Sequence, residues 1–382
     1  MPLEKFFQTQ TSARPLGVAR AAVGVAALIR AAIQYEILRS LIVGDAIRAP
    51  RFSWLPYVTL DFLWLFMGLW VLASISFALG FRTRLSGSVL LACLAYQLAL
   101  DENLYANNFY LMALIVLLLT VADSGCSFSL DRRLFRKDPE QVSRWSTLLP
   151  RLQISIVYFY SAVVKLNPAF LAGRAIVRST RLSGMLQGTL APQGIAAITI
   201  GVEFFLALAL WVPPLRRAAF ALGFLLHAAI FVGMNSTYTV AMFTFGLTML
   251  APYLLFLEQP PGSRLVIWDD CCSFCGAWIS ALRRLDWLRI HRFEGSSSVD
   301  ALGRAHVSRE EADTELKLSF DGRTLGGFDA VREVLCLLPL SFLWAPLLSV
   351  PPLPSIGRRL YRRVAERRKC TFALAVRKQT VH

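Results

Sequence analysis

The sequence predicts a multi-pass α-helical membrane bundle of about eight spans, followed by a small α/β domain. The 382 residues are 55% hydrophobic and only 17% charged, whereas soluble globular domains are about 25% charged. The long apolar stretches all fall between residues 16 and 257, while residues 261–382 carry alternating charge and turn signals. We therefore divide the chain into a membrane domain, 1–260, and a second domain, 261–382, with the boundary near Pro260-Pro261-Gly262.

Eight apolar stretches are candidates for membrane spans. A helix needs about 20 mainly apolar residues to cross the hydrocarbon core. The candidate stretches are roughly 16–35, 56–80, 86–103, 107–124, 149–169, 191–214, 217–235 and 237–257. The third and fourth are the shortest, and a re-entrant pair is the alternative interpretation there.

The loop charges predict the orientation in the bilayer. In an eight-span arrangement most basic loop residues fall on one side, which the positive-inside rule makes cytoplasmic. They are Lys5, Arg14, Arg82, Arg84, Arg132, Arg133, Arg136, Lys137, Arg216 and Arg217. The opposite loops carry fewer: Arg48, Arg51, Arg174, Arg178 and Arg181. We expect an integral protein of a bacterial inner membrane, with both termini in the cytoplasm.

The net charge of +15 invites comparison with nucleic-acid-binding proteins. Such proteins gather basic residues on a soluble face with stacking aromatics. Here the excess of Arg and Lys lies at the ends of apolar segments and in the C-terminal tail. The lipid bilayer, not nucleic acid, is the expected partner of these charges.

Several ionisable residues interrupt the apolar stretches. Glu203 and His227 lie mid-segment, and Asp61, Arg20 and Arg30 lie in other predicted helices. A charge facing lipid is costly, so these side chains should face the bundle interior and find partners. The structural alternative is that they only join helices by hydrogen bonds.

The predicted outer halves of the helices gather polar residues around Lys165. These are Asn167, Asp101, Glu102, Asn107, Asn108, Asn235 and Ser236, with His227 somewhat deeper. A lysine in a partly desolvated pocket can lose its proton near neutral pH and act as a base. The alternative is a lysine that snorkels from a helix end toward water.

The segment from Ile154 through Lys165-Leu166 to Phe170 and Gly173 resembles the signature of the HTTM family, which is related to vitamin K-dependent gamma-carboxylase. That signature has an aromatic-rich helix leading to Lys-Leu, an aromatic five positions after the lysine and a glycine eight positions after it. Asn107-Asn108-Phe109-Tyr110-Leu111 and the segment from Met234 to Phe243 are similar to further carboxylase segments. The resemblance spans roughly residues 16–257.

The resemblance implies that Lys165 is the base that deprotonates a reduced quinone. A quinone is then the implied cofactor, with Asn107, Asn108, Glu203, His227 and Asn235 as candidate binding residues. Phe109 stands where the carboxylase has a histidine, and Phe170 replaces the usual Trp. The chain also lacks the large domain that grips carboxylation substrates, so we do not expect gamma-glutamyl carboxylation.

The second domain opens with a dithiol motif. An apolar run, Arg264 to Trp268, leads into Asp269-Asp270-Cys271-Cys272-Ser273-Phe274-Cys275 and then a helical pattern. Cysteines at a helix start meet unpaired N–H groups and the positive end of the helix dipole, which favour negative charge on sulfur. Further strands are expected at 288–293 and 316–320, a tight turn at Asp321-Gly322, and a helix at 328–338. This alternation predicts a thioredoxin-like domain.

The same domain resembles the DCC family of thiol-disulfide oxidoreductases. The matching residues are Asp269-x-x-Cys272-x-x-Cys275, Asp321-Gly322, Gly327-Phe328-Asp329-Ala330 and Tyr361-x-x-Val364-Ala365-x-x-Arg368. The resemblance implies that Cys272 attacks a partner disulfide and Cys275 resolves the mixed disulfide. Asp269 is then a candidate proton acceptor or orienting group, the alternative being a turn or capping residue. Asp270 departs from the family's usual glycine and is expected to stiffen the turn or alter local charge.

Zinc is the rival interpretation of the cysteines. Seven cysteines without regular spacing do not describe a disulfide-stapled domain. A tetrahedral zinc site needs two ligands beyond Cys272 and Cys275, and the isolated candidates are Cys336, Cys370, His291 and His306. We therefore favour redox chemistry and predict no metal, with Cys271 as a spectator.

The C-terminal tail reads as a basic amphipathic helix. Its basic residues alternate with Ile356, Leu360, Val364 and Ala365, a pattern that suits the surface of an anionic leaflet. The alternative is an ordinary solvated helix face. The basic residues are Arg358, Arg359, Arg362, Arg363, Arg367, Arg368 and Lys369.

Three functional hypotheses follow. The first is a membrane-bound thiol-disulfide oxidoreductase with a cytoplasmic dithiol, a thiol or disulfide redox partner and a bundle that binds a quinone or another lipid-soluble substrate. The second is a non-enzymatic scaffold or maturation partner for secreted peptides. The third is a transporter with a dithiol switch, motivated by Glu203 and His227, although no inverted repeat is visible.

Overall fold

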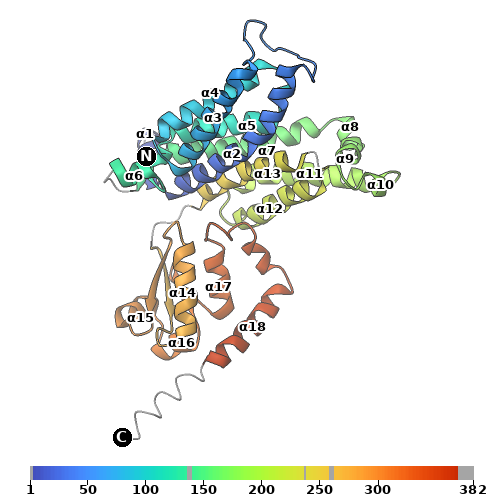
Figure 1. The fold of residues 1–382 in the computed structure, drawn as a ribbon. Helices are drawn as coiled ribbons and strands as arrows, with labels where there is room; N and C mark the ends of the chain where they lie inside the picture. The colour runs from blue at the N-terminus through green and yellow to red at the C-terminus, as the bar shows by residue number, and fades with distance from the viewer. Residues whose placement is uncertain (1–2, 136–139, 236–237, 258–261, 369–382) are drawn as a thin grey trace, which may run out of the picture. The chain divides into compact units, whose positions relative to one another are not determined.

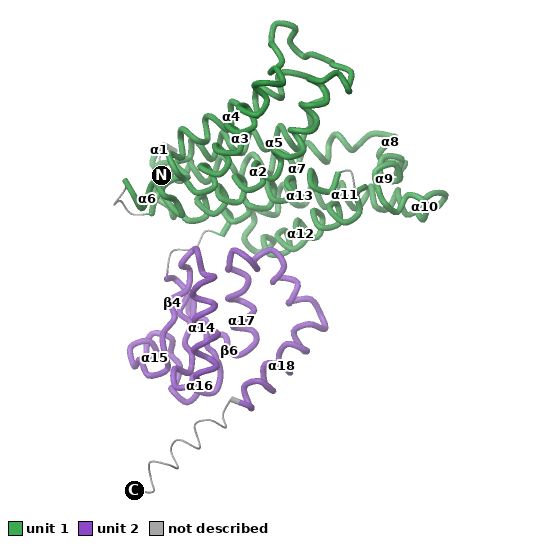
Figure 2. Tube along the Cα trace, viewed as in Figure 1, with its two compact units in different colours: residues 1–257 green, residues 258–382 purple. Residues whose placement is uncertain are grey.

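The computed structural model describes residues 3–135, 140–235, 238–257 and 262–368. The chain divides into two compact units, Met1–Leu257 and Glu258–His382 (Figure 2). Unit 1 is helical apart from one small pairing of strands, and unit 2 contains a four-stranded sheet. The two units are described separately below.

Unit 1 is a bundle of apolar helices (Figure 1). Its long helices are α2 (Arg14–Val43), α3 (Leu60–Leu79), α4 (Thr83–Leu100), α5 (Asn107–Val121), α7 (Trp145–Lys165), α11 (Ala191–Ala209), α12 (Arg216–Gly233) and α13 (Thr239–Leu250). The 3₁₀ helix η4 (Ala251–Phe256) continues α13. Helix α2 packs on α3, α13 and η4, and α7 packs on α11. Gly44 and Gly80, in the left-handed conformation, end α2 and α3, as is common at helix C-termini.

Short elements connect the long helices. Helix α1 (Leu3–Gln8) precedes strand β1 (Gln10–Ser12), which pairs antiparallel with β2 (Gln141–Ser143). The remaining short elements are η1 (Glu102–Leu104), η2 (Ser124–Cys126), α6 (Leu130–Phe135), α8 (Pro168–Leu171), α9 (Arg174–Ser179) and α10 (Ser183–Leu186). Because β1 and β2 pair, the start of α2 and the start of α7 lie at the same end of the bundle.

Seven of the described helices, counting α13 with η4 as one, are long and apolar enough to cross a membrane. The eighth apolar helix, α5, has 15 residues, about 22 Å at 1.5 Å per residue against a hydrocarbon core of about 30 Å. It packs against α2, α4, α7 and α13, so protein rather than lipid surrounds much of it. The predicted multi-pass bundle is confirmed, with α5 as its shortest member.

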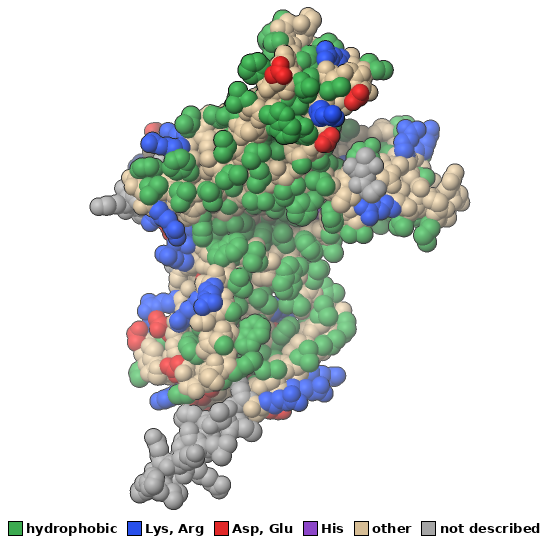
Figure 3. All heavy atoms as spheres, in the orientation of Figure 1, with side chains coloured by type: hydrophobic (Ala, Val, Ile, Leu, Met, Phe, Trp, Pro, Cys, Tyr) green, Lys and Arg blue, Asp and Glu red, His purple; other side chains and the backbone are tan. Residues whose placement is uncertain are grey.

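The outer surface of the bundle is suited to lipid. Hydrophobic side chains cover most of the visible face of unit 1 (Figure 3). Helix α3 alone exposes Phe62, Trp64, Leu65 and Leu72. Contiguous exposed apolar surface of this extent is rare on soluble monomers and agrees with an integral membrane protein.

Of the ionisable residues predicted to face the bundle interior, Arg20 is buried and Asp61 is exposed. Arg20 is fully buried and donates to the backbone carbonyls of Ser124, Ser127, Phe128 and Ala78, which joins α2 to the loop around η2. Asp61 is exposed in the first turn of α3, so the expectation that it faces the interior is wrong. A carboxylate in the first turn is favourably placed for the positive end of the helix dipole and needs no buried partner.

Unit 2 is built on β3 (Arg264–Trp268), β4 (His291–Gly295), β5 (Lys317–Phe320) and β6 (Arg323–Gly326), in the order β4-β3-β5-β6. Strand β3 is parallel to β4 and antiparallel to β5, and β5 pairs antiparallel with β6. Helix α14 (Ser273–Leu285) connects β3 to β4, and α17 (Gly327–Leu335) follows β6. A βαβ unit followed by an antiparallel hairpin and a helix is the predicted thioredoxin-like plan.

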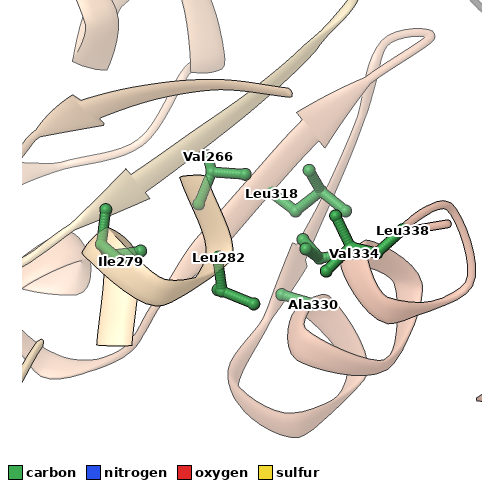
Figure 4. Close-up of a cluster of buried hydrophobic side chains, with 7 residues drawn as sticks. All are labelled: Val266, Ile279, Leu282, Leu318, Ala330, Val334 and Leu338. Carbon is green, nitrogen blue, oxygen red and sulfur yellow. The ribbon is translucent and has the colours of Figure 1, made fainter. Parts of the chain in front are cut away.

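The core of unit 2 lies between the sheet and the helices α14 and α17. Figure 4 shows Val266, Ile279, Leu282, Leu318, Ala330, Val334 and Leu338 together. The next strand residue, Ile267, faces the opposite side, against α15 (Val299–Ala305) and α16 (Arg309–Thr314). Successive strand residues face opposite sides of a sheet, so Val266 and Ile267 bury both faces.

The predicted elements of unit 2 are confirmed with shifted ends. The strand expected at 288–293 begins only at His291, because Arg289 adopts a left-handed conformation that turns the chain first. Asp321 and Gly322 have φ of 48° and 69°, the two positive values of a two-residue hairpin turn. After η5 (Ala345–Ser349), the basic tail forms helix α18 (Leu353–Arg368), and Lys369 and Cys370 lie outside the described residues.

Candidate redox site and intramembrane polar clusters

The dithiol lies where β3 ends and α14 begins. Cys272 is the N-cap residue of α14, and its Sγ accepts a hydrogen bond from the backbone N–H of Cys275 at 3.2 Å. A helix normally uses Ser, Thr, Asp or Asn in this position. Here the sulfur of Cys272 takes that role as the hydrogen-bond acceptor.

The two sulfurs differ in access. Cys275 is 7% exposed, in the first turn of α14, whereas Cys272 is more accessible. Cys271 is exposed in the preceding turn. An accessible sulfur beside a buried one is the asymmetry that an attacking and a resolving cysteine require.

Asp269 holds the turn before the cysteines. One carboxylate oxygen, Oδ1, accepts the N–H of Cys271 at 3.1 Å, and its backbone carbonyl accepts the N–H of Cys272 at 3.3 Å. A carboxylate oxygen of Asp269 and the sulfurs of Cys272 and Cys275 lie within 4.8 Å of one another. The turn role of Asp269 is therefore visible in the structure, and proton exchange between its carboxylate and the dithiol stays a prediction.

The same three atoms form a partial metal site. A structural zinc ion takes four ligands. Within the described ranges no fourth ligand, whether a histidine, a carboxylate or a thiolate, joins Asp269, Cys272 and Cys275. The Nδ1 atom of His291 instead lies 3.2 Å from a carboxylate oxygen of Asp286. Cys370, another candidate ligand, lies outside the described residues.

Asp270 ties the dithiol loop to the loop after β4. Its carboxylate accepts hydrogen bonds from the hydroxyls of Ser297 and Ser296, and Ser296 also donates to Asp313. Burial alone would raise the pKa of Asp270, but these hydrogen bonds outweigh it, and the pKa lies below the usual value for aspartate. A Cβ on Gly295 would lie 2.1 Å from Oδ2 of Asp270, so the two loops approach closely. Where the related family has glycine, this chain has a carboxylate that anchors the turn.

Lys165 lies in an ion pair inside the bundle. Its ammonium is 2.8 Å from both carboxylate oxygens of Glu203 and also donates to the hydroxyl of Ser161. Ser161 in turn donates to Glu203 at 2.9 Å. The lysine side chain is 24% exposed and the glutamate side chain 7%. Lys165, Glu203 and Ser161 therefore form one hydrogen-bonded cluster that joins α7 to α11.

His227, on α12, belongs to a second cluster, which it forms with Tyr158 of α7 and Tyr253. Its Nε2 lies 2.9 Å from the hydroxyl of Tyr158, which accepts a hydrogen bond from the hydroxyl of Tyr253 at 2.7 Å. The Nδ1 atom of His227 is buried without a hydrogen-bond partner among the described residues. Tyr158 lies seven residues before Lys165, on the same face of α7, so the two clusters share one helix face.

The remaining candidates lie elsewhere. Asn107 is exposed at the start of α5, Asn108 is partly buried, and Asn235 is partly buried after α12. No hydrogen bond joins any of the three to Lys165 within the described part of the chain. The structure therefore groups Lys165 with Glu203, and does not group it with these asparagines.

Sequence reasoning missed Ser161, Tyr158 and Tyr253. Ser161 and Tyr158 precede Lys165 by four and seven residues, and that helical spacing was readable in the sequence. Tyr253 lies 95 residues from Tyr158, and no local pattern predicts such a contact.

Two family comparisons agree with this arrangement. Residues 266–373 match the DCC1-like thiol-disulfide oxidoreductase family, and residues 8–260 match the HTTM domain. No solved structure matches the chain. The HTTM match covers more than half of the 382 residues. The chain is thus a member of the HTTM family that carries a DCC1-like thiol-disulfide oxidoreductase domain at its C-terminal end.

Proposed function

We propose that the protein is a membrane-bound thiol-disulfide oxidoreductase whose dithiol, Cys272 and Cys275, works at the cytoplasmic surface. The observation that carries the proposal is the N–H of Cys275 directed at the sulfur of Cys272 at the start of α14. The match to a family of thiol-disulfide oxidoreductases supports it. The basic loops at the ends of the spans support the cytoplasmic side.

The exchange proceeds in two balanced steps. The Cys272 thiolate attacks a disulfide of the partner, forms a mixed disulfide and releases one partner thiolate, which takes up a proton. Cys275 loses its proton and attacks the Cys272 sulfur, which closes the intramolecular disulfide and releases the second partner thiol. Counted from the reduced dithiol, the protein loses two electrons and two protons, one from Cys272 when its thiolate forms and one from Cys275 by way of Asp269, and the partner disulfide gains both. Asp269 accepts the Cys275 proton in this scheme.

Trapping the mixed disulfide tests the proposal. Cys275→Ser should accumulate a mixed disulfide with a small probe such as oxidised glutathione, because nothing resolves it. Cys272→Ser should accumulate none at this motif, and Cys271→Ser, which removes the exposed neighbouring thiol, should behave as the unsubstituted protein. Mass spectrometry of the peptide 264–283 locates the adduct. An adduct on Cys271 instead of Cys272 would contradict the assignment, and full function in Cys272→Ser would favour a scaffold.

We propose further that the bundle binds a lipid-soluble quinone near Lys165. Reduction of the Cys272–Cys275 disulfide by a quinol balances, because each couple exchanges two electrons and two protons. The Lys165, Glu203 and Ser161 cluster supplies buried groups that hold and exchange a proton. A mobile quinone is required because the orientation by loop charges puts Lys165 toward the face opposite the dithiol.

Quinol-dependent reduction in proteoliposomes tests this second step. Purified protein with an oxidised dithiol is mixed with a reduced menaquinone analogue, and free thiols are counted by alkylation. Glu203→Gln should slow the quinol reaction at least tenfold while leaving the reaction with dithiothreitol unchanged. Equal loss with both reductants would mean a structural defect, and no quinol reaction in the unsubstituted protein would end the quinone proposal.

A further inference from the structure

Arg30 is a buried cation in the middle of α2. It is 5% exposed, and its guanidinium carbon lies 5.6 Å over the ring of Phe109, which stacks on Trp70. Within the described residues it forms no ion pair and no hydrogen bond, and its Nε is buried without a partner. Arg20, ten residues earlier on the same helix, has carbonyl acceptors for both terminal nitrogens. The contrast shows that this bundle satisfies a buried arginine where its own backbone provides the acceptors.

Three amide side chains of the bundle also have buried atoms without a hydrogen-bond partner among the described residues. Gln34 is one turn further along α2, and Gln97 lies in the last turn of α4; neither amide atom of either side chain has a hydrogen bond in the described structure. The Oδ1 atom of Asn108, next to Phe109, is likewise unpartnered. Gln34 and Gln97 are 1% and 0% exposed.

The helix connections place these side chains toward one end of the bundle. Helix α5 packs against both α2 and α4. The chain that follows α2 is hydrogen-bonded to the end of α4, through Ala49 to the Asp101 carboxylate at 2.9 Å and through Arg51 to the Leu100 carbonyl at 3.2 Å. Gln34 on α2, Gln97 on α4 and Asn108 on α5 therefore lie toward the same end, and Arg30 contacts the residue beside Asn108.

So many unsatisfied groups in one part of a membrane protein require an explanation. More than about 90% of buried polar groups in native proteins have a hydrogen-bond partner, and a buried group left without one destabilises the fold. Water could serve the amides but cannot neutralise the guanidinium. A buried charge without a charged partner is still more costly, and an anion at the guanidinium would offset that cost.

We propose that Arg30, Gln34, Gln97 and Asn108 form a binding site for a carboxylate. The guanidinium carbon lies over the ring of Phe109, and at the N–H edge of a guanidinium a planar carboxylate accepts two parallel hydrogen bonds. The amide NH₂ groups of Gln34 and Gln97 add donors, and the amide oxygens accept from water that accompanies the ligand. The carboxylate belongs either to a small anion from water or to a fatty acid from the bilayer. The site is independent of the proposed chemistry at Lys165 and at the dithiol.

Binding of two radiolabelled probes tests the site. Full-length protein in phosphatidylcholine nanodiscs is titrated with acetate or with oleate. We expect saturable binding of one probe at about one molecule per chain, reduced at least tenfold in Arg30→Met and severalfold in Gln97→Leu. Acetate binding alone identifies a small aqueous anion, and oleate binding alone an acyl carboxylate from the bilayer.

The matched control is Arg39→Met, which removes the same charge from an exposed position on the same helix and should bind as the unsubstituted protein. In probe-free nanodiscs Arg30→Met should unfold at the same or a higher temperature, because it removes a charge that has no partner. If Arg30→Met does not fold, Gln97→Leu still tests the site without altering the charge. The proposal is overturned if neither probe binds the unsubstituted protein saturably. It is also overturned if Arg30→Met or Gln97→Leu binds the probe as tightly as the unsubstituted protein.

Discussion

Lys165 and Glu203 join two helices that are separate in sequence, α7 and α11. The ammonium contacts both carboxylate oxygens at 2.8 Å, with Ser161 bonded to each partner. Breaking a buried pair by removing one partner costs about 3–5 kcal/mol because a charge is left alone. Lys165 is partly exposed, so solvent reduces this cost.

A double-mutant cycle measures this interaction. We expect Glu203→Gln and Lys165→Met each to lower the free energy of unfolding by about 1–3 kcal/mol, and the double variant to lose clearly less than the sum, with a coupling above about 1 kcal/mol. Unfolding in mixed detergent micelles gives the values. The control cycle is the Arg84–Asp123 pair, 69% and 35% exposed, where about 0.2–1 kcal/mol is expected. A smaller coupling at Lys165–Glu203 than at the control pair would contradict a close buried pair.

The pKa of Asp270 lies below the usual aspartate value, which links the stability of unit 2 to pH. Because the folded state binds its proton more weakly than the unfolded state, Asp270 stabilises the fold above the unfolded pKa of about 3.9. This contribution is lost as pH falls through the lower folded pKa.

Asp270→Asn should therefore lower the stability of unit 2 at pH 7 and flatten its decline in acid. Hydrogen exchange at the Ser296 amide, which donates to the Trp268 carbonyl at 2.8 Å, reports the opening of this region. The free energy of opening should fall more steeply below about pH 4 in the unsubstituted protein than in Asp270→Asn. Asp300→Asn, at an exposed position, serves as the control. Parallel pH curves for the unsubstituted protein and Asp270→Asn would contradict the account.

The sequence alone predicted which residues belong to these sites better than it predicted which of them contact one another. Cys272, Cys275 and Asp269 follow one another in a single loop, so local spacing was enough to expect them together. Glu203 and Lys165 are 38 residues apart, and their pairing depends on how α7 meets α11. Arg30 was expected to find a partner inside the bundle, and that is wrong for the described residues: packing puts an aromatic ring, not a carboxylate, beside it.

At the scale of the helix, Gly24 marks a close approach of α2 to α3. A Cβ at Gly24 would lie 2.7 Å from the backbone N and Cα of Ala78, whereas a Cβ at Gly68 on α3 meets nothing within 4 Å. In a helix, glycine costs about 0.5–1 kcal/mol relative to alanine. Replacement by alanine is therefore expected to have opposite effects at Gly24 and at Gly68.

Gly24→Ala should lower the free energy of unfolding by about 1–3 kcal/mol through overpacking, and Gly68→Ala should leave it unchanged or raise it by up to about 1 kcal/mol. Unfolding in mixed micelles compares them directly. A shift of both variants in the same direction would show that α2 and α3 do not cross at Gly24.

The elements that sequence predicted are those with a strong apolar pattern. All eight apolar stretches form helices, and β3 and β5 appear where short apolar segments predicted strands. Strand β6, Arg323–Gly326, is an exposed edge strand without apolar alternation, and it was not predicted. Helix α16 was also missed, although Ser308 and Glu311 form a capping box that is readable in the sequence.

Helix α18 shows how one pattern can serve two purposes. The predicted amphipathic helix forms, but Arg358 pairs with Asp329 at 2.8 Å and the Tyr361 hydroxyl accepts the Leu316 N–H. Ile356, Leu360 and Val364 remain exposed. Part of the helix therefore stabilises unit 2, and docking of its exposed apolar side chains on an anionic leaflet stays a prediction.

For the whole molecule, the division into a membrane unit and a thioredoxin-like unit follows from composition, because lipid and water select different residues. The arrangement within each unit depends on contacts between distant segments. The claim that unites both units is that a membrane protein carries a dithiol able to open and close a disulfide.

Differential alkylation of the full-length protein across a series of glutathione redox buffers tests this claim most directly. Mass spectrometry of the peptide 264–283 counts free and bonded sulfurs at each buffer potential. The account predicts a reversible two-electron transition between the Cys272–Cys275 dithiol and its disulfide, absent in Cys272→Ser and unchanged in Cys271→Ser. Sulfurs that stay reduced in every buffer, or that react only after a chelator removes stoichiometric zinc, would contradict it.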